Sequence, residues 1–233
     1  MMKEQYFTSG TLETEASVIM RRLACRNRRH VPQWDISGAA LLVLDMQNVF
    51  LNPGSHAFIP SAPAIIPGIR RTIALFRRMG RPVILTRHTN TPDNAGAMDR
   101  WWNDRIDPSD PQSMIHPGIH FEIQSNMHTD IETGDAEIIE KHQYDAFHGT
   151  HLDAYLQGHA VTRVVITGVM THICCDSTAR AAFHRGYSVF FAVDGTATYT
   201  RALHVAAVET LGHCCAVPIL LDTLSGTSMS KSD

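Results

Sequence analysis

Short apolar runs alternate along this chain with longer mixed segments that end in glycine, a pattern typical of α/β proteins. The runs predict strands over Ala39–Leu44, Pro82–Thr86, Glu137–Lys141, Arg163–Thr167, Ser188–Val193 and Cys214–Leu220. The longer segments predict helices over Ala64–Met79, Thr150–Gln157, Cys174–Arg185 and Arg201–Leu211, closed by Gly80, Gly158, Gly186 and Gly212. We expect a three-layer α/β/α, Rossmann-like fold, with a mostly parallel six-stranded sheet and helices on both faces.

The two ends of the chain lie outside this alternation. Residues 1–36 form an N-terminal arm in which Leu12–Leu23 fits an amphipathic helix. A basic cluster follows, made of Arg21, Arg22, Arg26, Arg28 and Arg29. The arm is either a solvated segment or a contact with a neighbouring subunit. We expect one domain over residues 37–222 and a flexible tail over 223–233.

Composition narrows the classes of function without choosing one. The 233 residues suffice for one sizeable α/β domain, and the formal net charge of -3 argues against nucleic-acid binding. No apolar stretch is long enough to span a membrane, and the first residues do not resemble a secretory signal. Four of the five cysteines come as adjacent pairs, which make poor disulfides, so we expect a reducing cytoplasm.

Two polar positions follow buried strands, at the sheet edge where α/β proteins bind ligands. Asp45 ends the apolar run Ala39–Leu44, and Cys174 follows Gly168 at the predicted start of a helix. A helix N-terminus favours negative charge, so we expect Cys174 to have a lowered pKa and to be a thiolate more often than a free cysteine. The alternatives are a turn-forming Asp45 and a cysteine pair that only fills the core.

Three segments of the chain together resemble the signature motifs of the isochorismatase-like cysteine hydrolases. They are Leu44-Asp45-Met46-Gln47-Asn48, Glu140-Lys141-His142-Gln143-Tyr144-Asp145-Ala146-Phe147 and Gly168-Val169-Met170-Thr171-His172-Ile173-Cys174. The resemblance runs from about Ser37 to about Leu221 and implies the isochorismatase-like hydrolase fold. It also implies a catalytic triad of Asp45, Lys141 and Cys174, and a cis peptide bond between Val169 and Met170. Lys141 has no other feature that singles it out.

The resemblance implies cleavage of a C–N bond in a small amide, carbamoyl or ureido compound. Cys174 would attack the carbonyl carbon, Asp45 would carry the proton, and Lys141 would hold both charges in place. The backbone N–H groups of Met170 and Cys174 would form the oxyanion hole. The reaction passes through a thioester and needs no cofactor. Family members are commonly dimers or tetramers, so a homo-oligomer is expected.

The long polar segment from Arg87 to about Asp135 is expected to form a lid over the pocket. The residues expected to bind substrate are Gln47, Arg87, His88, Arg100, Trp101 and His172. Nicotinamidase-type relatives bind zinc, but the strand end Thr86-Arg87-His88 lacks their Asp two residues before the His. We therefore expect no metal.

Two other functions stay open. His172 lies two residues before Cys174, as in true isochorismatases, which hydrolyse a vinyl ether through the aspartate without needing the cysteine. Asp45 alone would then carry the reaction. The second alternative is a catalytically inactive binding protein with the same fold.

Overall fold

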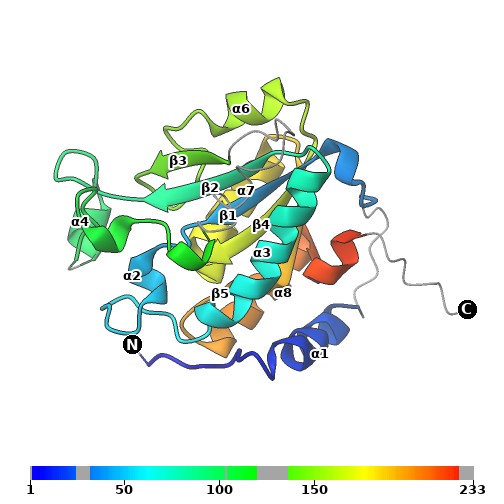
Figure 1. Cartoon of the computed structure of the whole chain (residues 1–233), viewed down its shortest axis with the longest axis horizontal. Coiled ribbons are helices and arrows are strands. Elements are labelled where there is room, and N and C mark those ends of the chain that lie inside the picture. Colours follow the sequence, from blue (N-terminus) through cyan, green and yellow to red (C-terminus); the bar gives the residue numbers. More distant parts are fainter. Residues whose placement is uncertain (1, 25–31, 103, 120–135, 226–233) are drawn as a thin grey trace, which may run out of the picture.

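The computed structural model describes residues 2–24, 32–102, 104–119 and 136–225, and within them one parallel sheet organises the chain (Figure 1). Its strands are β1 Ala39–Leu44, β2 Val83–His88, β3 Glu137–Lys141, β4 Arg163–Val169, β5 Ser188–Ala197 and β6 Ala216–Ile219. The spatial order is β3-β2-β1-β4-β5-β6, and every neighbouring pair is parallel. The predicted six-stranded α/β fold is confirmed, and the sheet is wholly parallel.

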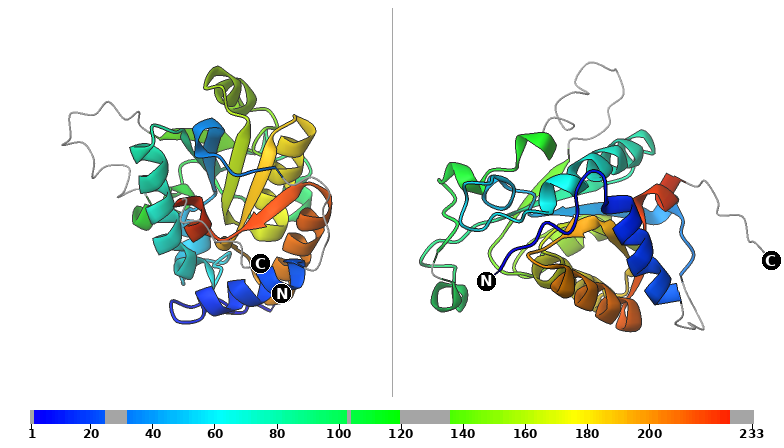
Figure 2. Two further views of the ribbon diagram at one scale, coloured as in Figure 1. Left: turned by 90° about the vertical axis from the view of Figure 1, so that its right-hand side faces the viewer. Right: turned by 90° about the horizontal axis from the view of Figure 1, so that it is seen from below.

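Helices cover both faces of this sheet. They are α1 Leu12–Ala24, α2 Asn48–Leu51, α3 Ala62–Arg78, α4 Met98–Trp101, α6 Leu152–Gly158, α7 Asp176–His184 and α8 Arg201–Cys214. On one face α3 packs across β1, β2, β4 and β5, while α7 and α8 lie on the other face (Figure 2). None of the described helices combines the length and apolarity that a membrane crossing requires.

The ends of some elements differ from the predictions. The last helix was expected to close at Gly212, but α8 continues through the buried Gly212 to Cys214, and β6 begins only at Ala216. Packing of the last turn of α8 outweighs the preference of glycine for a helix end. Gly80 and Gly186 take positive φ values of 61° and 89° directly after their helices, as predicted.

Gly168 sets how closely the two central strands approach. It has a φ of 106°, and a Cβ built there would lie 2.1 Å from the carbonyl oxygen of Leu44. Only glycine tolerates both conditions. This contact joins the end of β1 to the end of β4, and the segments that carry Asp45 and Cys174 therefore begin side by side.

The N-terminal segment before α1 packs against other parts of the same chain. Glu4 N–H donates to the carbonyl of Tyr199 at 2.8 Å, and the buried Phe7 donates from its N–H to Ser61 Oγ at 3.1 Å. The following helix α1 contacts β5, β6 and α8. Of the basic cluster, Arg22 pairs with Glu209 at 3.0 Å, whereas three arginines lie outside the described residues, namely Arg26, Arg28 and Arg29. Contact of this arm with a second subunit remains a prediction.

Candidate active site

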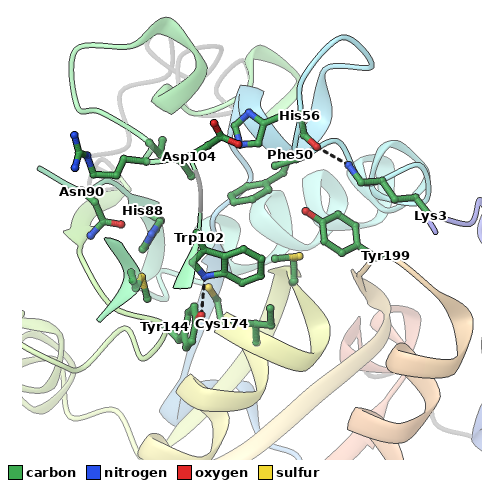
Figure 3. Close-up of a pocket in the computed structure, with 16 residues that line it drawn as sticks. Lys3, Phe50, His56, His88, Asn90, Trp102, Asp104, Tyr144, Cys174 and Tyr199 are labelled. Atoms are coloured by element: carbon green, nitrogen blue, oxygen red, sulfur yellow. Dashed lines mark hydrogen bonds between the residues drawn. The ribbon is translucent and has the colours of Figure 1, made fainter. Parts of the chain in front are cut away.

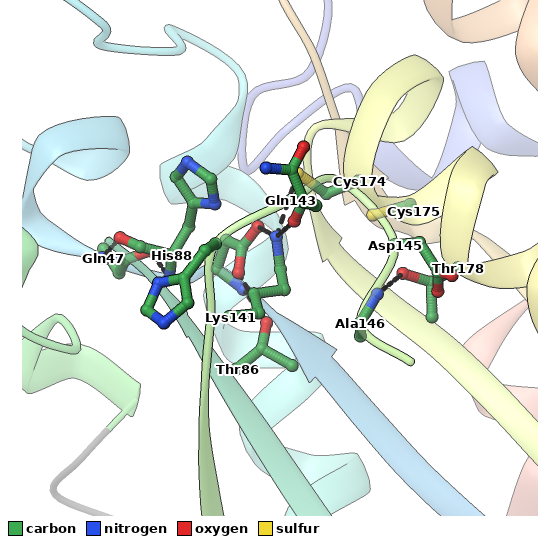
Figure 4. Close-up of polar contacts among 12 residues, drawn as sticks. Gln47, Thr86, His88, Lys141, Gln143, Asp145, Ala146, Cys174, Cys175 and Thr178 are labelled. Atoms are coloured by element: carbon green, nitrogen blue, oxygen red, sulfur yellow. Dashed lines mark hydrogen bonds and ion pairs between the residues drawn. The ribbon is translucent and has the colours of Figure 1, made fainter. Parts of the chain in front are cut away.

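Asp45, Lys141 and Cys174 come together at the carboxyl ends of the strands. Figure 4 shows Lys141 and Cys174 next to each other. Asp45 directly follows β1, Lys141 is the last residue of the edge strand β3, and Cys174 lies in the turn after β4. Lys141 Nζ is 2.8 Å from Asp45 Oδ2 and 3.4 Å from Cys174 Sγ. The structure thus gathers three residues that are far apart in the sequence around one ammonium group.

The Asp45–Lys141 ion pair is fully buried, with both side chains 0% exposed. Burial alone would raise the pKa of Asp45, but the charge of Lys141 and hydrogen bonds from Lys141 and Thr86 hold that pKa below its usual value. Burial would likewise lower the pKa of Lys141, and the negative charge of Asp45 raises it instead. Both groups are therefore charged at neutral pH.

The thiol of Cys174 differs from the expectation. Burial and, to a smaller extent, the Asp45 carboxylate together raise its pKa to about 12 despite the nearby Lys141. Cys174 does not open an α-helix either, because residues Thr171–Cys175 form a π-helical turn and α7 starts at Asp176. The predicted lowering of the Cys174 pKa is therefore wrong. The raised pKa favours a protonated thiol at Cys174, next to the buried Asp45 carboxylate.

Hydrogen bonds fix the orientation of the two charged groups. Thr86 on β2 donates its hydroxyl proton to Asp45 Oδ1 and accepts the Asp45 backbone N–H at 3.1 Å. Asp45 has a φ of 51°, in the left-handed region that aspartate tolerates better than most residues. Lys141 Nζ also donates to the carbonyl of Gln143 at 3.0 Å. The carboxylate and the ammonium are thus each held in place by neighbouring groups of the protein.

A cavity of about 410 Å³ opens above Cys174 (Figure 3). Its walls are largely aromatic and apolar, and charged groups join them. The lining residues are Lys3, Phe50, His56, Ala57, His88, Asn90, Met98, Trp102, Asp104, Arg105, Ile106, Tyr144, Met170, Ile173, Cys174 and Tyr199. Cys174 and Met170, the two residues expected to form the oxyanion hole, both line it, and the Val169–Met170 peptide bond is cis.

Of the residues expected to bind substrate, only His88 lines this cavity. Gln47 is fully buried and instead holds the backbone of His88, accepting its N–H at 2.8 Å and donating to its carbonyl at 2.9 Å. Arg87 donates to the carbonyl of Pro108, away from the cavity. His172 is hydrogen-bonded through its ring Nδ1 to the Thr198 hydroxyl at 2.7 Å and does not line the cavity.

The aromatic wall comes from the neighbour of the expected tryptophan. Trp101, like Arg100, is exposed, with 77% of its surface accessible, whereas Trp102 lines the cavity and donates from Nε1 to the Tyr144 hydroxyl at 2.8 Å. The pair Trp101-Trp102 marked this region in the sequence, but not which of the two faces inward. Residues 103 and 120–135 of the expected lid lie outside the described residues.

His88 is a neutral imidazole at the cavity wall. Burial, followed by the charge of Lys141, lowers its pKa to about 4. His56 also lines the cavity, but no cluster of three or more histidine, cysteine or carboxylate side chains suited to a metal occurs within the described ranges. Thr86, two residues before His88, is hydrogen-bonded to Asp45.

The wholly parallel sheet with helices on both faces makes this chain a three-layer α/β protein. A buried carboxylate, an ammonium group and a thiol meet where its strands end. The isochorismatase domain model matches residues 39–223, and the chain therefore belongs to the isochorismatase family. This confirms the resemblance drawn from the three motifs.

Characterised and solved relatives are similar over most of the chain. Nicotinamidase 3 of Arabidopsis thaliana is 36% identical over 189 residues, covering 80% of this chain and 86% of that protein. The N-carbamoylsarcosine amidase structure from Thermoplasma acidophilum has a TM-score of 0.65 at 26% identity, covering 79% and 96% of the two chains. A cysteine hydrolase structure from Pseudomonas syringae pv. phaseolicola 1448A shares the fold, with a TM-score of 0.74 at 22% identity and coverage of 85% and 96%.

Proposed function

We propose that this protein hydrolyses the C–N bond of a small amide, carbamoyl or ureido compound through a thioester on Cys174. The supporting observation is the position of Cys174 Sγ, at the cavity wall and 3.4 Å from the ammonium of a buried Asp45–Lys141 pair. The similar proteins include a nicotinamidase and an N-carbamoylsarcosine amidase, whose names both denote amide cleavage.

The charges of the site supply the proton transfers. When the substrate carbonyl approaches, the thiol proton passes to Asp45, the S–C bond forms, and the carbonyl oxygen becomes an oxyanion. The backbone N–H groups of Met170 and Cys174 are the proposed donors to that oxyanion. Lys141 keeps its proton and stabilises the negative charge as it moves between Asp45 and Cys174.

The second half of the reaction returns the proton. The C–N bond breaks, Asp45 gives its proton to the departing nitrogen, and ammonia or an amine leaves a thioester on Cys174. A water molecule then gives a proton to Asp45 and attacks the thioester. The product acid leaves as Asp45 returns that proton to the Cys174 sulfur. Asp45 therefore acts twice as base and twice as acid and ends the cycle as a carboxylate.

Ether hydrolysis, the first alternative, has weaker support. His172 was the residue that suggested this reaction, but it is hydrogen-bonded to Thr198 and does not line the cavity. Cys174, which that reaction does not need, is present in the lining. The thiol chemistry uses every polar group of the triad, whereas the ether chemistry leaves the cysteine without a role.

Substitution of Cys174 tests the proposal. Cys174→Ala should lower the release of ammonia from a panel of small linear amides by at least about a thousandfold, because the nucleophile is lost. The matched control is Cys175→Ala, since Cys175 is equally buried but does not line the cavity. It should keep its activity. An active Cys174→Ala with an inactive Asp45→Ala would favour the ether reaction, and a wild type inactive on the whole panel would favour the binding protein.

A further inference from the structure

The cavity above Cys174 contains one residue from outside the family domain. Lys3 lies in the N-terminal segment, whereas the domain match begins at residue 39. Its Nζ donates to the carbonyl of His56 at 2.7 Å and lies 4.8 Å from the centroid of the Tyr199 ring (Figure 3). The cation therefore sits between two segments of the cavity wall.

Lys3 is held there by the residues that follow it. The backbone N–H of Glu4 donates to the carbonyl of Tyr199, and the Glu4 carboxylate accepts the Arg201 N–H at 2.9 Å. The Tyr6 hydroxyl accepts the Thr198 N–H at 2.9 Å. These bonds anchor the segment to the loop between β5 and α8, so the backbone position of Lys3 is part of the folded structure.

The charge of Lys3 has no carboxylate partner among the described residues. Arg105, the other permanent cation of the lining, is paired with Asp99 at 2.5 Å. The contacts of Lys3 are a carbonyl dipole and a ring face, which orient an ammonium without neutralising it. Asp104 also lines the cavity, so the lining is not uniformly positive. Lys3 is the cation that remains available to an anionic ligand.

We propose that Lys3 is a substrate-binding residue and that the substrate is an amide with a carboxylate at the end away from its C–N bond. This inference rests on the proposed function, which places the C–N bond at Cys174. The aromatic and apolar walls, among them Phe50, Trp102 and Ile106, contact the uncharged middle of such a molecule. An N-terminal segment that the family domain does not include then selects the substrate.

Aldehydes provide a probe that needs no knowledge of the substrate. The Cys174 sulfur adds to the aldehyde carbon, the C=O π bond breaks, and the thiol proton passes through Asp45 to the former carbonyl oxygen. The product is a reversible thiohemiacetal. The anionic probes are succinic semialdehyde and terephthalaldehydic acid, each compared with its neutral methyl ester. Calorimetric titration of the full chain measures the Kd of each aldehyde.

We expect each acid to bind about two- to fivefold more tightly than its ester, the range of a partly solvated ion pair. Lys3→Met should bring the ratio of the two dissociation constants close to one, and Lys3→Arg should keep it. The matched control is Arg78→Met, which removes one exposed positive charge at the far end of α3. It should leave the ratio unchanged.

The outcomes separate this inference from the proposed function. If Lys3→Met leaves the ratio of the acid and ester dissociation constants unchanged, the role of Lys3 is overturned and the proposed function is not affected. An equal loss in Arg78→Met assigns the effect to net charge and also overturns it. Aldehydes that bind Cys174→Ala as well as the wild type, or that bind neither, contradict the proposed thiol chemistry and the inference with it.

Discussion

At the residue scale, the balance at Asp45 and Lys141 governs the site. Removing two charges from water costs several kcal/mol per ion, and only a close partner with additional hydrogen bonds offsets that cost. Here the partner is at 2.8 Å, and Thr86 and Gln143 supply the additional bonds. Neither charge can be removed alone without leaving the other buried and unpaired.

Lys141→Met should therefore lower the free energy of unfolding by about 3–5 kcal/mol, because Asp45 is left uncompensated. The double variant with Asp45→Asn should be more stable than the sum of the two single losses predicts. Denaturant unfolding measures all of these. The control is Arg105→Met, which breaks an exposed ion pair with Asp99 and should cost under about 1 kcal/mol. Equal losses at both sites would contradict the role assigned to burial.

How far these residues could be predicted depended on the signal each one carries. Asp45 ends a run of six buried apolar residues, so its place at the sheet edge followed from the pattern. Lys141 has no local signal, and only the resemblance of three motifs identified it. Gln47 was among the residues expected to bind substrate, but its amide bonds the backbone of His88. The direction of a side chain in a loop depends on contacts that sequence spacing does not contain.

At the element scale, the approach of β4 to β1 brings the turn that carries Cys174 next to Asp45. The strands align so that Leu44 faces Gly168, and Asp45 and the Cys174 turn follow directly. A side chain at position 168 would occupy the space of the Leu44 backbone. The close approach of Leu44 and Gly168 is thus required by the site as well as by the fold.

Gly168→Ala should destabilise the protein by at least about 3 kcal/mol, because the new methyl group overlaps the Leu44 backbone at a φ of 106°. Thermal unfolding measures the loss. Gly158→Ala is the control, because Gly158 ends α6 with nothing within 4 Å of its built Cβ. That change should be neutral or stabilise by up to about 1 kcal/mol. A tolerated Gly168→Ala would show that β4 does not need this close approach.

The bounds of β1 and β3 match the predicted ranges, whereas the other predicted strands and helices differ by one to four residues at one end or both. β1 matches because its apolar run stops at Asp45. The π-helical turn over Thr171–Cys175 has no sequence signal, so the nucleophile was assigned to the start of an α-helix. The raised pKa of Cys174 follows from its burial. The hydrophobic pattern around one cysteine does not tell how deeply that cysteine is buried.

At the scale of the whole molecule, burial of histidines links stability to pH. Burial lowers the pKa of His88 to about 4 and that of the fully buried His204 to about 3. In the unfolded chain both would titrate near 6.5, so acid favours unfolding below that pH. Burial raises the pKa of Asp194 to about 6, which works in the opposite direction for one proton.

The free energy of unfolding should therefore fall as the pH drops from 6.5 toward 4. Two histidine protons opposed by one carboxyl proton leave a slope of about 1.4 kcal/mol per pH unit. Urea unfolding at several pH values measures it. In His204→Gln one of the two histidine protons is lost and the slope should become shallower, whatever the stability of that variant at neutral pH. An unchanged slope would mean that His204 does not titrate on unfolding.

The overall topology was predictable because parallel sheets have long connections and buried strands, both of which show in the sequence. The contribution of the N-terminal segment to the cavity was not. Lys3 lies 53 residues from His56 in the sequence, and no pattern connects the two. Contacts of this kind depend on where a loop and a terminal segment meet after the sheet has formed.

The proton on Cys174 has a consequence for how the protein survives between reactions. Oxidants such as hydrogen peroxide attack thiolates far faster than thiols, and the first product is a sulfenic acid. With a pKa of about 12, the sulfur carries almost no thiolate at rest. In the proposed mechanism Cys174 becomes nucleophilic only while a carbonyl is bound, so the idle protein is protected from this oxidation.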